Sequence, residues 1–270
     1  MLLLAGCTQH NRHTKISDIT IRYSYDNTHE FIIIPLGGGR YFLLDTGTEK
    51  SIVFRDRIKI KSTFRQFALL NRQRLISIRN AKSFQIGDLL IENFNFVYMR
   101  SRNTLWENDT TIVGIIGMDI LSQIYSYFDI KNQTIIFSNE RKNKAESPSL
   151  ILSYKKPTRP LVSLCINGIA FEYVLFDTGF NRFLGLLKTD KEILNLQVEA
   201  MGALIQGIIG NSRPAYRKTP NYVKINNVVF DAPIIMYSRT HIPRLLGMGF
   251  IRQFSSFSID PFERKIMFFE

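Results

Sequence analysis

Apolar and polar positions follow one another along this chain in short runs that are typical of β-strands. The runs lie between clusters of Gly, Pro, Asn and Asp, which favour turns. The predicted strands include residues 31–36, 84–91, 94–99, 222–230 and 233–237. Short helices are predicted at residues 120–125 and 250–254. The pattern therefore predicts an all-β fold of closed or sandwiched units with short helices.

The second half of the chain repeats the first. Three anchors recur: an apolar run that ends in Asp-Thr-Gly, two aliphatic residues before Gly-Met, and an Asp that precedes a turn and a last apolar strand. They lie at residues 45–47 and 177–179, at residues 115–118 and 245–248, and at Asp129 and Asp260. Because all three keep one register to within two residues, the chain is interpreted as a fused duplication.

The boundary between the two copies is marked by composition. Residues 139–149 are charged, contain Pro and Ser, and lack apolar periodicity, as expected of a linker. The predicted organisation is therefore a first lobe over residues 19–138 and a second lobe over residues 150–270. Residues 1–18 are predicted to be a signal remnant or linker.

A run of three glycines, Gly37-Gly38-Gly39, raises the alternative of a phosphate-binding loop. Such a loop needs a following Lys-Ser/Thr and a helix, and neither is present. The corresponding place in the second copy holds Asn167-Gly168 between two predicted strands. Both segments are therefore predicted to be hairpin turns with positive φ angles.

The composition predicts a sizeable hydrophobic core and a positively charged surface. Hydrophobic residues make up 45% of 270 residues, and the formal net charge is +12. Such a charge attracts polyanions or an anionic membrane surface. The basic residues cluster at Arg55, Arg57, Lys59, Lys61 and Arg65, and at Arg141, Lys142 and Lys144. Since no nucleic-acid module accompanies them, they are interpreted as a solvated face and part of the linker, and no nucleic-acid partner is expected.

The two cysteines, Cys7 and Cys165, exclude a disulfide framework. Cys165 lies in an apolar run and is predicted to be a buried small hydrophobe. Leu4-Ala5-Gly6-Cys7 resembles the bacterial lipoprotein processing box, although the apolar run before it is shorter than in a secretory signal. We expect an exported protein of the bacterial cell envelope, attached to the membrane through a lipidated Cys7, with a cytoplasmic protein as the alternative.

The repeated Asp-Thr-Gly offers chemistry that one copy would not. Hydrolysis of an amide by water needs a base for the water proton and an acid for the carbonyl oxygen, and two carboxyl groups can fill both roles. Held close together, they cannot both ionise cheaply and titrate as a pair. One Asp-Thr-Gly alone is adequately explained as a turn. Two copies in register favour Asp45 and Asp177 as one catalytic dyad.

An apolar strand into Asp-Thr-Gly, followed some seventy residues later by two aliphatics and Gly, resembles the aspartic peptidases of pepsin and retroviral-protease type. The resemblance covers most of the chain, twice. It implies two related β-barrel-like lobes of the acid-protease fold with a cleft between them, and an endopeptidase that acts on peptides or unfolded proteins. No cofactor is expected, and a monomer is expected because a fused pair of lobes needs no partner to complete its site. It also implies that Thr46 and Thr178 reach into the opposite loop, and that Gly47 and Gly179 permit close packing.

The two copies differ directly after the motif, where Thr48 stands in the first and Phe180 in the second. A hydroxyl there can donate to Asp45 and favour its ionised form, whereas Phe180 has no donor. We therefore predict that Thr48 supports the dyad, that Asp45 is the base, and that Asp177 carries the proton.

A mobile cover over the cleft is expected by analogy. In the second half, Gly202, Gly207 and Gly210 punctuate an apolar stretch that suits such a flap. The matching stretch of the first half, residues 64–78, is basic and has no Tyr. Pepsin-like enzymes have a Tyr in the flap of their first half, so the chain is more similar to a fused retroviral-type pair than to pepsin. The alternative for both stretches is an ordinary surface loop.

Two other functions stay open from the sequence. One is a catalytically silent two-lobed protein that binds peptides or proteins, since function depends on the site and not on the fold. The other rests on the net charge of +12 alone and predicts salt-dependent binding of nucleic acid or anionic lipid. Metal catalysis is disfavoured because the four histidines, His10, His13, His29 and His241, show no ligand spacing.

Overall fold

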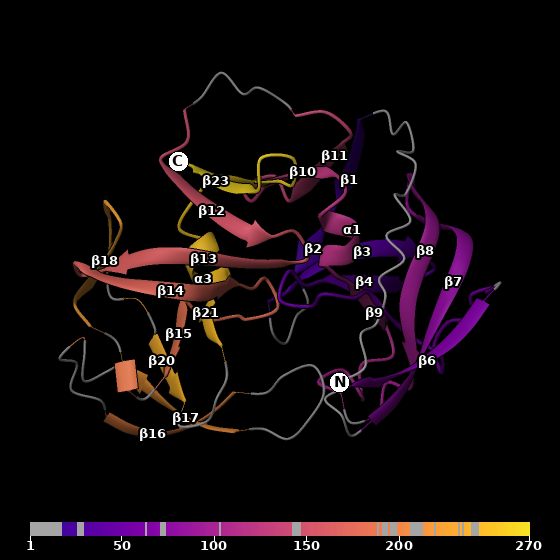
Figure 1. The fold of residues 1–270 in the computed structure, drawn as a ribbon, viewed down its shortest axis with the longest axis horizontal. Coiled ribbons are helices and arrows are strands. Elements are labelled where there is room, and N and C mark those ends of the chain that lie inside the picture. Colours follow the sequence, from indigo (N-terminus) through magenta and orange to yellow (C-terminus); the bar gives the residue numbers. More distant parts are fainter. Residues whose placement is uncertain are drawn as a thin grey trace, which may run out of the picture.

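The computed structural model shows an all-β molecule of two lobes that lie side by side (Figure 1). This confirms the predicted fold class. The structure describes residues 18–25, 30–62, 64–70, 74–102, 104–141, 147–187, 189–190, 194, 199–205, 213–218, 220–231, 233, 235–238 and 243–270. Cys7, the four histidines, Gly207 and Gly210 lie outside these residues.

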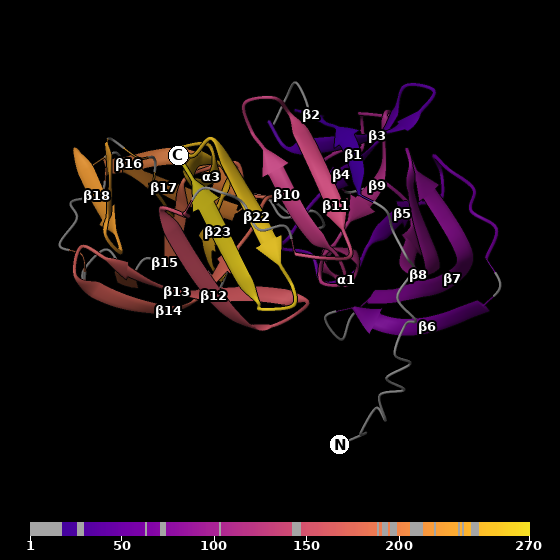
Figure 2. The same cartoon turned by 90° about the horizontal axis from the view of Figure 1, so that it is seen from above.

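One antiparallel sheet belongs to both halves and joins the lobes, as Figure 2 shows. Its order is β1-β11-β10-β22-β23-β12. The bounds are β1 Ile19–Arg22, β10 Tyr125–Asp129, β11 Thr134–Ser138, β12 Leu150–Lys156, β22 Ser256–Asp260 and β23 Lys265–Phe269. The centre is the pairing of β10 with β22, where the rings of Phe128 and Phe257 stack with centroids 4.2 Å apart and planes 3° apart. Neither half can build this sheet alone.

The first lobe is a separate sheet in the order β2-β3-β4-β9-β5-β8-β7-β6. Its strands are β2 Ser24–Tyr25, β3 Ile32–Gly37, β4 Arg40–Leu44, β5 Ile52–Phe54, β6 Phe64–Leu70, β7 Arg74–Ile86, β8 Leu89–Met99 and β9 Ile112–Ile116. The strand before the first Asp-Thr-Gly, β4, pairs in parallel with β9, the strand of the first aliphatic anchor. The two anchors of the first half therefore lie side by side.

The second lobe repeats this arrangement on an extension of the shared sheet, in the order β12-β13-β14-β21-β15-β20-β17-β16. Its strands are β13 Arg159–Ile166, β14 Ile169–Phe176, β15 Leu184–Leu187, β16 Glu199–Ile205, β17 Arg213–Lys218, β18 Tyr222–Ile225, β19 Val228–Asp231, β20 Ile235–Ser238 and β21 Arg244–Leu246. Again the strand before Asp-Thr-Gly, β14, pairs in parallel with the strand of the aliphatic anchor, β21. The topology thus matches the duplication seen in the sequence.

The predicted helices exist but begin earlier than expected. They are α1 Met118–Leu121 and α3 Met248–Ile251, each beginning directly after the anchor glycine. The prediction was displaced because the apolar pattern continues past each helix into the next strand, and Tyr125 already belongs to β10. The predicted hairpin turns are confirmed, with positive φ angles at Gly37, Gly38, Gly39, Asn167 and Gly168.

Two predicted strands are hairpins instead. Residues 84–91 run through the turn at Gly87 between β7 and β8, and residues 222–230 run through the turn at Asn226 between β18 and β19. In each case apolar residues on both arms bury toward the same core and mask the break in the pattern. Positive φ angles of 56° at Gly87 and 52° at Asn226 are the local signal of these turns.

The core follows from strand alternation. Leu44 and Ile116 bury in the main apolar core, which extends through both lobes and the shared sheet. Their neighbours Leu43 and Ile115 point to the opposite face and bury in a second cluster with Trp106. Each strand beside Asp45 is therefore apolar on both faces, which explains the continuous apolar runs of the sequence.

Two predictions about single residues are wrong. Arg57 is not part of a solvated face: its guanidinium donates to the carbonyl oxygens of Trp106, Glu107, Asp109 and Ile112, with the last bond at 2.7 Å. It fastens the segment between β8 and β9 to the lobe, because an arginine can satisfy several carbonyls at once. Cys165 is half-buried, since alternation along β13 turns it away from the core.

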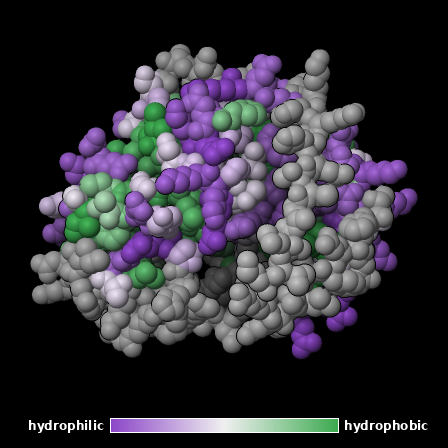
Figure 3. All heavy atoms as spheres, in the orientation of Figure 1, coloured by the Kyte–Doolittle hydropathy of each residue, from purple (hydrophilic) through white to green (hydrophobic). Residues whose placement is uncertain are grey.

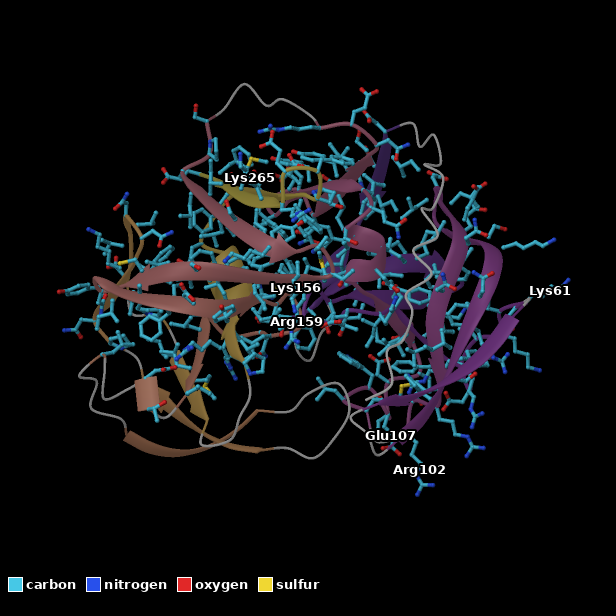
Figure 4. The ribbon with its side chains drawn as sticks, in the orientation of Figure 1. Lys61, Arg102, Glu107, Lys156, Arg159 and Lys265 are labelled. Atoms are coloured by element: carbon cyan, nitrogen blue, oxygen red, sulfur yellow. The ribbon has the colours of Figure 1, made fainter. Side chains whose placement is uncertain are left out.

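Ion pairs connect the lobes outside the shared sheet. Arg159, at the start of β13, pairs with Glu49 of the first lobe at 3.5 Å, and Figure 4 shows Arg159 and Lys156 at the junction. On the other side, Arg252 pairs with Glu30 and lies over the ring of Tyr25. Because the charged groups are partly exposed, each pair is worth about 0–1 kcal/mol. No helix among the described residues is long and apolar enough to span a membrane.

Candidate active site

The two Asp-Thr-Gly loops begin where β4 and β14 end, and each is held by its neighbouring aliphatic strand. The amide of Asp45 donates to the carbonyl of Ile116 at 3.0 Å, and the amide of Asp177 donates to Leu246 at 2.9 Å. Each parallel pair therefore continues by one hydrogen bond into the loop. The matching bonds place Asp45 and Asp177 in equivalent positions of the two lobes.

The threonines cross from each loop into the other. The hydroxyl of Thr46 donates to the carbonyl of Phe176 at 2.8 Å and accepts from the amide of Thr178 at 3.0 Å. The hydroxyl of Thr178 donates to the carbonyl of Leu44 at 3.0 Å and accepts from the amide of Thr46 at 3.0 Å. Both threonines are fully buried. Four reciprocal hydrogen bonds therefore fix the two loops against each other.

Each carboxyl group packs on the glycine of the opposite loop. A Cβ atom on Gly47 would lie 2.5 Å from the Cγ atom of Asp177, and one on Gly179 would lie 2.6 Å from the Cγ atom of Asp45. No side chain fits at either glycine. The absence of a Cβ atom is what allows the two carboxyl groups to approach each other.

Asp45 and Asp177 hydrogen-bond through their side chains and differ in the rest of their surroundings. Asp45 accepts from the hydroxyl of Thr48 at 2.8 Å and from the amide of Gly47 at 2.7 Å. Asp177 accepts from the amide of Gly179 at 2.8 Å. The first carboxyl group therefore has one more donor to stabilise its charge.

The pKa values of the two groups are displaced to different extents. Burial and the neighbouring Asp45 carboxylate raise the pKa of Asp177 well above its ordinary value. Burial also raises the pKa of Asp45, but the donors Thr48 and Gly47 and the proton on Asp177 oppose that rise. The two environments therefore raise the pKa of Asp177 further than that of Asp45.

Phe180 occupies the place that Thr48 has in the first lobe. It is 7% exposed and packs in a small apolar cluster with Leu175, Met236 and Leu245. A Cβ atom on Gly247 would lie 2.6 Å from its ring, so the aliphatic anchor leaves room for the aromatic side chain. Apolar surface thus stands beside Asp177 where a hydroxyl stands beside Asp45.

The sequence did not single out a polar contact behind the first loop. Asp119 in α1 accepts from the amide and the hydroxyl of Ser51, the latter at 2.7 Å, and the Ser51 hydroxyl accepts from the amide of Gly117 at 3.0 Å. A signal was available, because the second copy has Phe183 and Gly249 at the corresponding positions.

The predicted flap stretches form antiparallel hairpins, β6–β7 in the first lobe and β16–β17 in the second. Each lies at the end of its lobe's sheet, and residues 71–73 and 206–212 lie outside the described part. Figure 3 shows a hollow between the lobes. In the part of the chain that the structure covers, no three His, Cys, Asp or Glu side chains gather as ligands of a metal would.

Comparison with known proteins gives resemblance at the level of the fold. No protein-family model matches the chain, and no curated protein matches it. Among solved structures, basic 7S globulin from soybean is 12% identical with a TM-score of 0.51, and the match covers 94% of both chains. Conglutin gamma, a basic 7S globulin from lupine seeds, is 10% identical with a TM-score of 0.51 over 94% of this chain and 95% of that one.

A retropepsin-like aspartic protease from Rickettsia conorii is 20% identical with a TM-score of 0.36, over 44% of this chain and 89% of that chain. The chain shares its overall fold with both 7S globulins. At these identities the likeness extends to the fold alone, and both globulins are named as globulins and not as enzymes.

Proposed function

We propose that this chain is an aspartic-type endopeptidase in which Asp45 and Asp177 activate one water molecule. The observation that carries the proposal is the hydrogen-bonded pair of carboxyl groups, with Asp45 buried and Asp177 partly buried, each lying against the glycine of the opposite loop. A turn or a purely structural aspartate does not require this arrangement. The strongly displaced pKa of Asp177 adds support, because such shifts cluster at functional sites.

A pair of carboxyl groups that shares one proton can act as both base and acid in the hydrolysis of an amide. Ionised Asp45 takes a proton from water as the water oxygen attacks the peptide carbonyl, while Asp177 gives its proton to the carbonyl oxygen. Collapse of the tetrahedral intermediate then needs a proton on the leaving nitrogen, which the newly protonated Asp45 supplies, while the carboxylate of Asp177 takes a proton from a hydroxyl of the intermediate and the pair returns to its starting state. Acid–base help of this kind is worth about 10²- to 10⁴-fold. The expected substrate is a peptide or an unfolded protein segment.

A catalytically silent binding protein of the same fold is the second candidate. The resemblance to two 7S globulins over 94% of the chain supports it, as does Phe180 where the first lobe has Thr48. In this case the groove between the lobes would hold a peptide without cleaving it. The two candidates differ in turnover, which one experiment measures.

The test is cleavage of a peptide library between acidic and neutral pH by the wild type, Asp45→Asn and Asp177→Asn. We expect cleavage by the wild type and a loss of about 10²-fold or more in kcat/KM for each variant, because neither carboxyl group can replace the other's role. Asp231→Asn, at an exposed position of β19, is the matched control and keeps wild-type activity.

Each outcome decides between the candidates. Cleavage that survives in either dyad variant contradicts the proposed mechanism. A wild type that binds peptides from the library and cleaves none at any pH supports the silent binding protein instead.

A further inference from the structure

The support behind the first Asp-Thr-Gly loop depends on side chains. Asp119 accepts from the Ser51 amide at 3.0 Å and from the Ser51 hydroxyl at 2.7 Å. Ser51 is fully buried, and its hydroxyl accepts from the amide of Gly117 at 3.0 Å. The carboxylate of Asp119 thus holds a serine that in turn holds the anchor glycine.

Met118, the residue after Gly117, connects this contact to Thr48 and so to the dyad. The amide of Met118, next to Gly117, donates to the carbonyl of Thr48 at 2.8 Å, and the hydroxyl of Thr48 donates to Asp45 at 2.8 Å. The fit is tight, since a Cβ atom on Gly117 would lie 2.7 Å from the Thr48 carbonyl oxygen. A displacement of Gly117 therefore moves the residue that donates to Asp45.

In the second lobe, a backbone carbonyl and an aromatic residue hold the anchor glycine in place of the Ser51 and Asp119 side chains. The amide of Gly247 donates to the carbonyl of Phe183 at 3.1 Å, where its first-lobe counterpart uses the Ser51 hydroxyl. Gly249 replaces Asp119, and a Cβ atom there would lie 2.6 Å from the Phe183 amide nitrogen. Among the residues that the structure covers, hydrogen-bonding side chains therefore lie behind the loop of Asp45 and not behind the loop of Asp177.

We propose that Asp119 is a positioning residue of the dyad, which acts through Ser51, Gly117 and Thr48 to hold the donor of Asp45 in place. This role rests on the proposed peptidase function. The Asp119 carboxyl group accepts hydrogen bonds from Ser51, and its contribution reaches Asp45 through the four hydrogen-bonding steps given above.

The direction of the effect distinguishes positioning from simple charge. Loss of the Thr48 donor raises the pKa of Asp45 and moves the acid limb of kcat/KM to higher pH. Loss of a negative charge at Asp119 would act directly on Asp45 in the opposite direction. Lys50 is the charged group whose field acts on Asp119, and burial raises the pKa of Asp119 in spite of Ser51 and Lys50.

The experiment measures the pH dependence of peptide cleavage for Asp119→Ala and Asp119→Asn. We expect the alanine variant to move the acid limb to higher pH, and for each pH unit that the limb moves, kcat/KM below it falls by about tenfold. The asparagine variant keeps an acceptor for Ser51 and stays near the wild type. Equal displacements to lower pH in both variants would overturn the proposal in favour of a charge effect, as would an unmoved limb in both.

A double variant tests the path. Thr48→Ala alone should move the acid limb upward, and Asp119→Ala added to it should cause no further movement, because both act on one hydrogen bond. A further movement contradicts the path through Thr48. Asp56→Ala is the matched control: Asp56 holds the amide and hydroxyl of Ser101 as Asp119 holds Ser51, but away from the dyad. It should leave the limb unchanged.

Carboxyl-carbon chemical shifts of Asp45 and Asp177 give the same titration without turnover. If the wild type cleaves no peptide, the proposed function fails while this measurement still decides the role of Asp119. An unchanged pair titration in Asp119→Ala would then reject the positioning role by itself.

Discussion

At the scale of single residues, the glycine of the opposite loop leaves no space for a side chain beside each carboxyl group. Gly47 and Gly179 lie where any Cβ atom would overlap the opposite aspartate. Neither glycine has a positive φ angle, so backbone freedom does not explain them. Close approach of the two carboxyl groups is the reason for glycine at both positions.

Gly179→Ala tests this reason. The added methyl carbon would stand 2.6 Å from the Cγ atom of Asp45 and push the two carboxyl groups apart. We expect a loss of roughly 10²-fold or more in kcat for the substitution, since small misplacements of reacting groups cost that much. Gly168→Ala is the control: its φ of 86° makes the change costly for stability by about 1 kcal/mol, but its surroundings are open and activity should persist.

The raised pKa of Asp177 predicts how stability depends on pH. The folded chain keeps a proton on Asp177 where the unfolded chain has lost it, so the contribution is full below the ordinary carboxyl pKa of about 4. It is lost as pH rises through the raised folded value. We expect the wild-type Tm to fall from about pH 4 toward neutral pH, and Asp177→Asn to flatten that slope and exceed the wild type at neutral pH.

Thermal unfolding across this pH range measures the effect, with Asp231→Asn as the control that keeps the wild-type slope. A slope that Asp177→Asn leaves unchanged would mean that the folded chain holds no extra proton at this site.

At the scale of elements, two loops on different lobes form one unit. The four threonine hydrogen bonds join residues 130 to 134 positions apart, such as Thr46 and Thr178. Parallel pairing of β4 with β9 and of β14 with β21 fixes where each Asp-Thr-Gly loop begins in its lobe. The loops therefore depend on both sheets.

Thr178→Val tests the contribution of one hydroxyl. Valine has nearly the same shape, but it leaves the buried carbonyl of Leu44 and the amide of Thr46 without partners. We expect a loss of about 1–3 kcal/mol in the free energy of unfolding for each unpaired group, measured by urea denaturation. Thr20→Val, on the exposed side of β1, should stay within about 0.5 kcal/mol of the wild type. Equal stability of Thr178→Val and the wild type would show that the cross-lobe bonds contribute nothing.

At the scale of the whole molecule, the shared sheet sets the distance between the lobes. β10 and β22 pair along their length, and Phe128 stacks on Phe257 at the point where the duplicated halves meet. Both rings are fully buried in a core that continues into each lobe. The dyad is assembled only when this joint is formed.

Phe128→Ala should weaken the joint and the whole fold together. We expect a loss of about 3–5 kcal/mol in the free energy of unfolding, because a large buried ring leaves a cavity. Phe262→Ala, at a position 49% exposed, is the matched control and should change stability little. Denaturation in a single transition is expected for all three proteins, and a mutant in which one lobe unfolds first would contradict a common core.

The sequence by itself determined the elements whose signal is local or repeated. The alternation of apolar residues predicted an all-β chain, the turn residues at 37–39 and 167–168 predicted two hairpins, and the repeated anchors predicted which aspartates belong together. The breaks at Gly87 and Asn226 were missed because apolar residues continue through both turns.

Only the tertiary structure decided what depends on contact between distant positions. That Asp45 sits on Gly179, that Ser51 meets Asp119 across 68 residues, and that Arg57 is half-buried among carbonyls are facts of packing. Periodicity fixes which face of a strand a side chain lies on, but not what it meets there. The order of the two carboxyl pKa values likewise depends on burial and on the number of donors, which exist only in the folded chain.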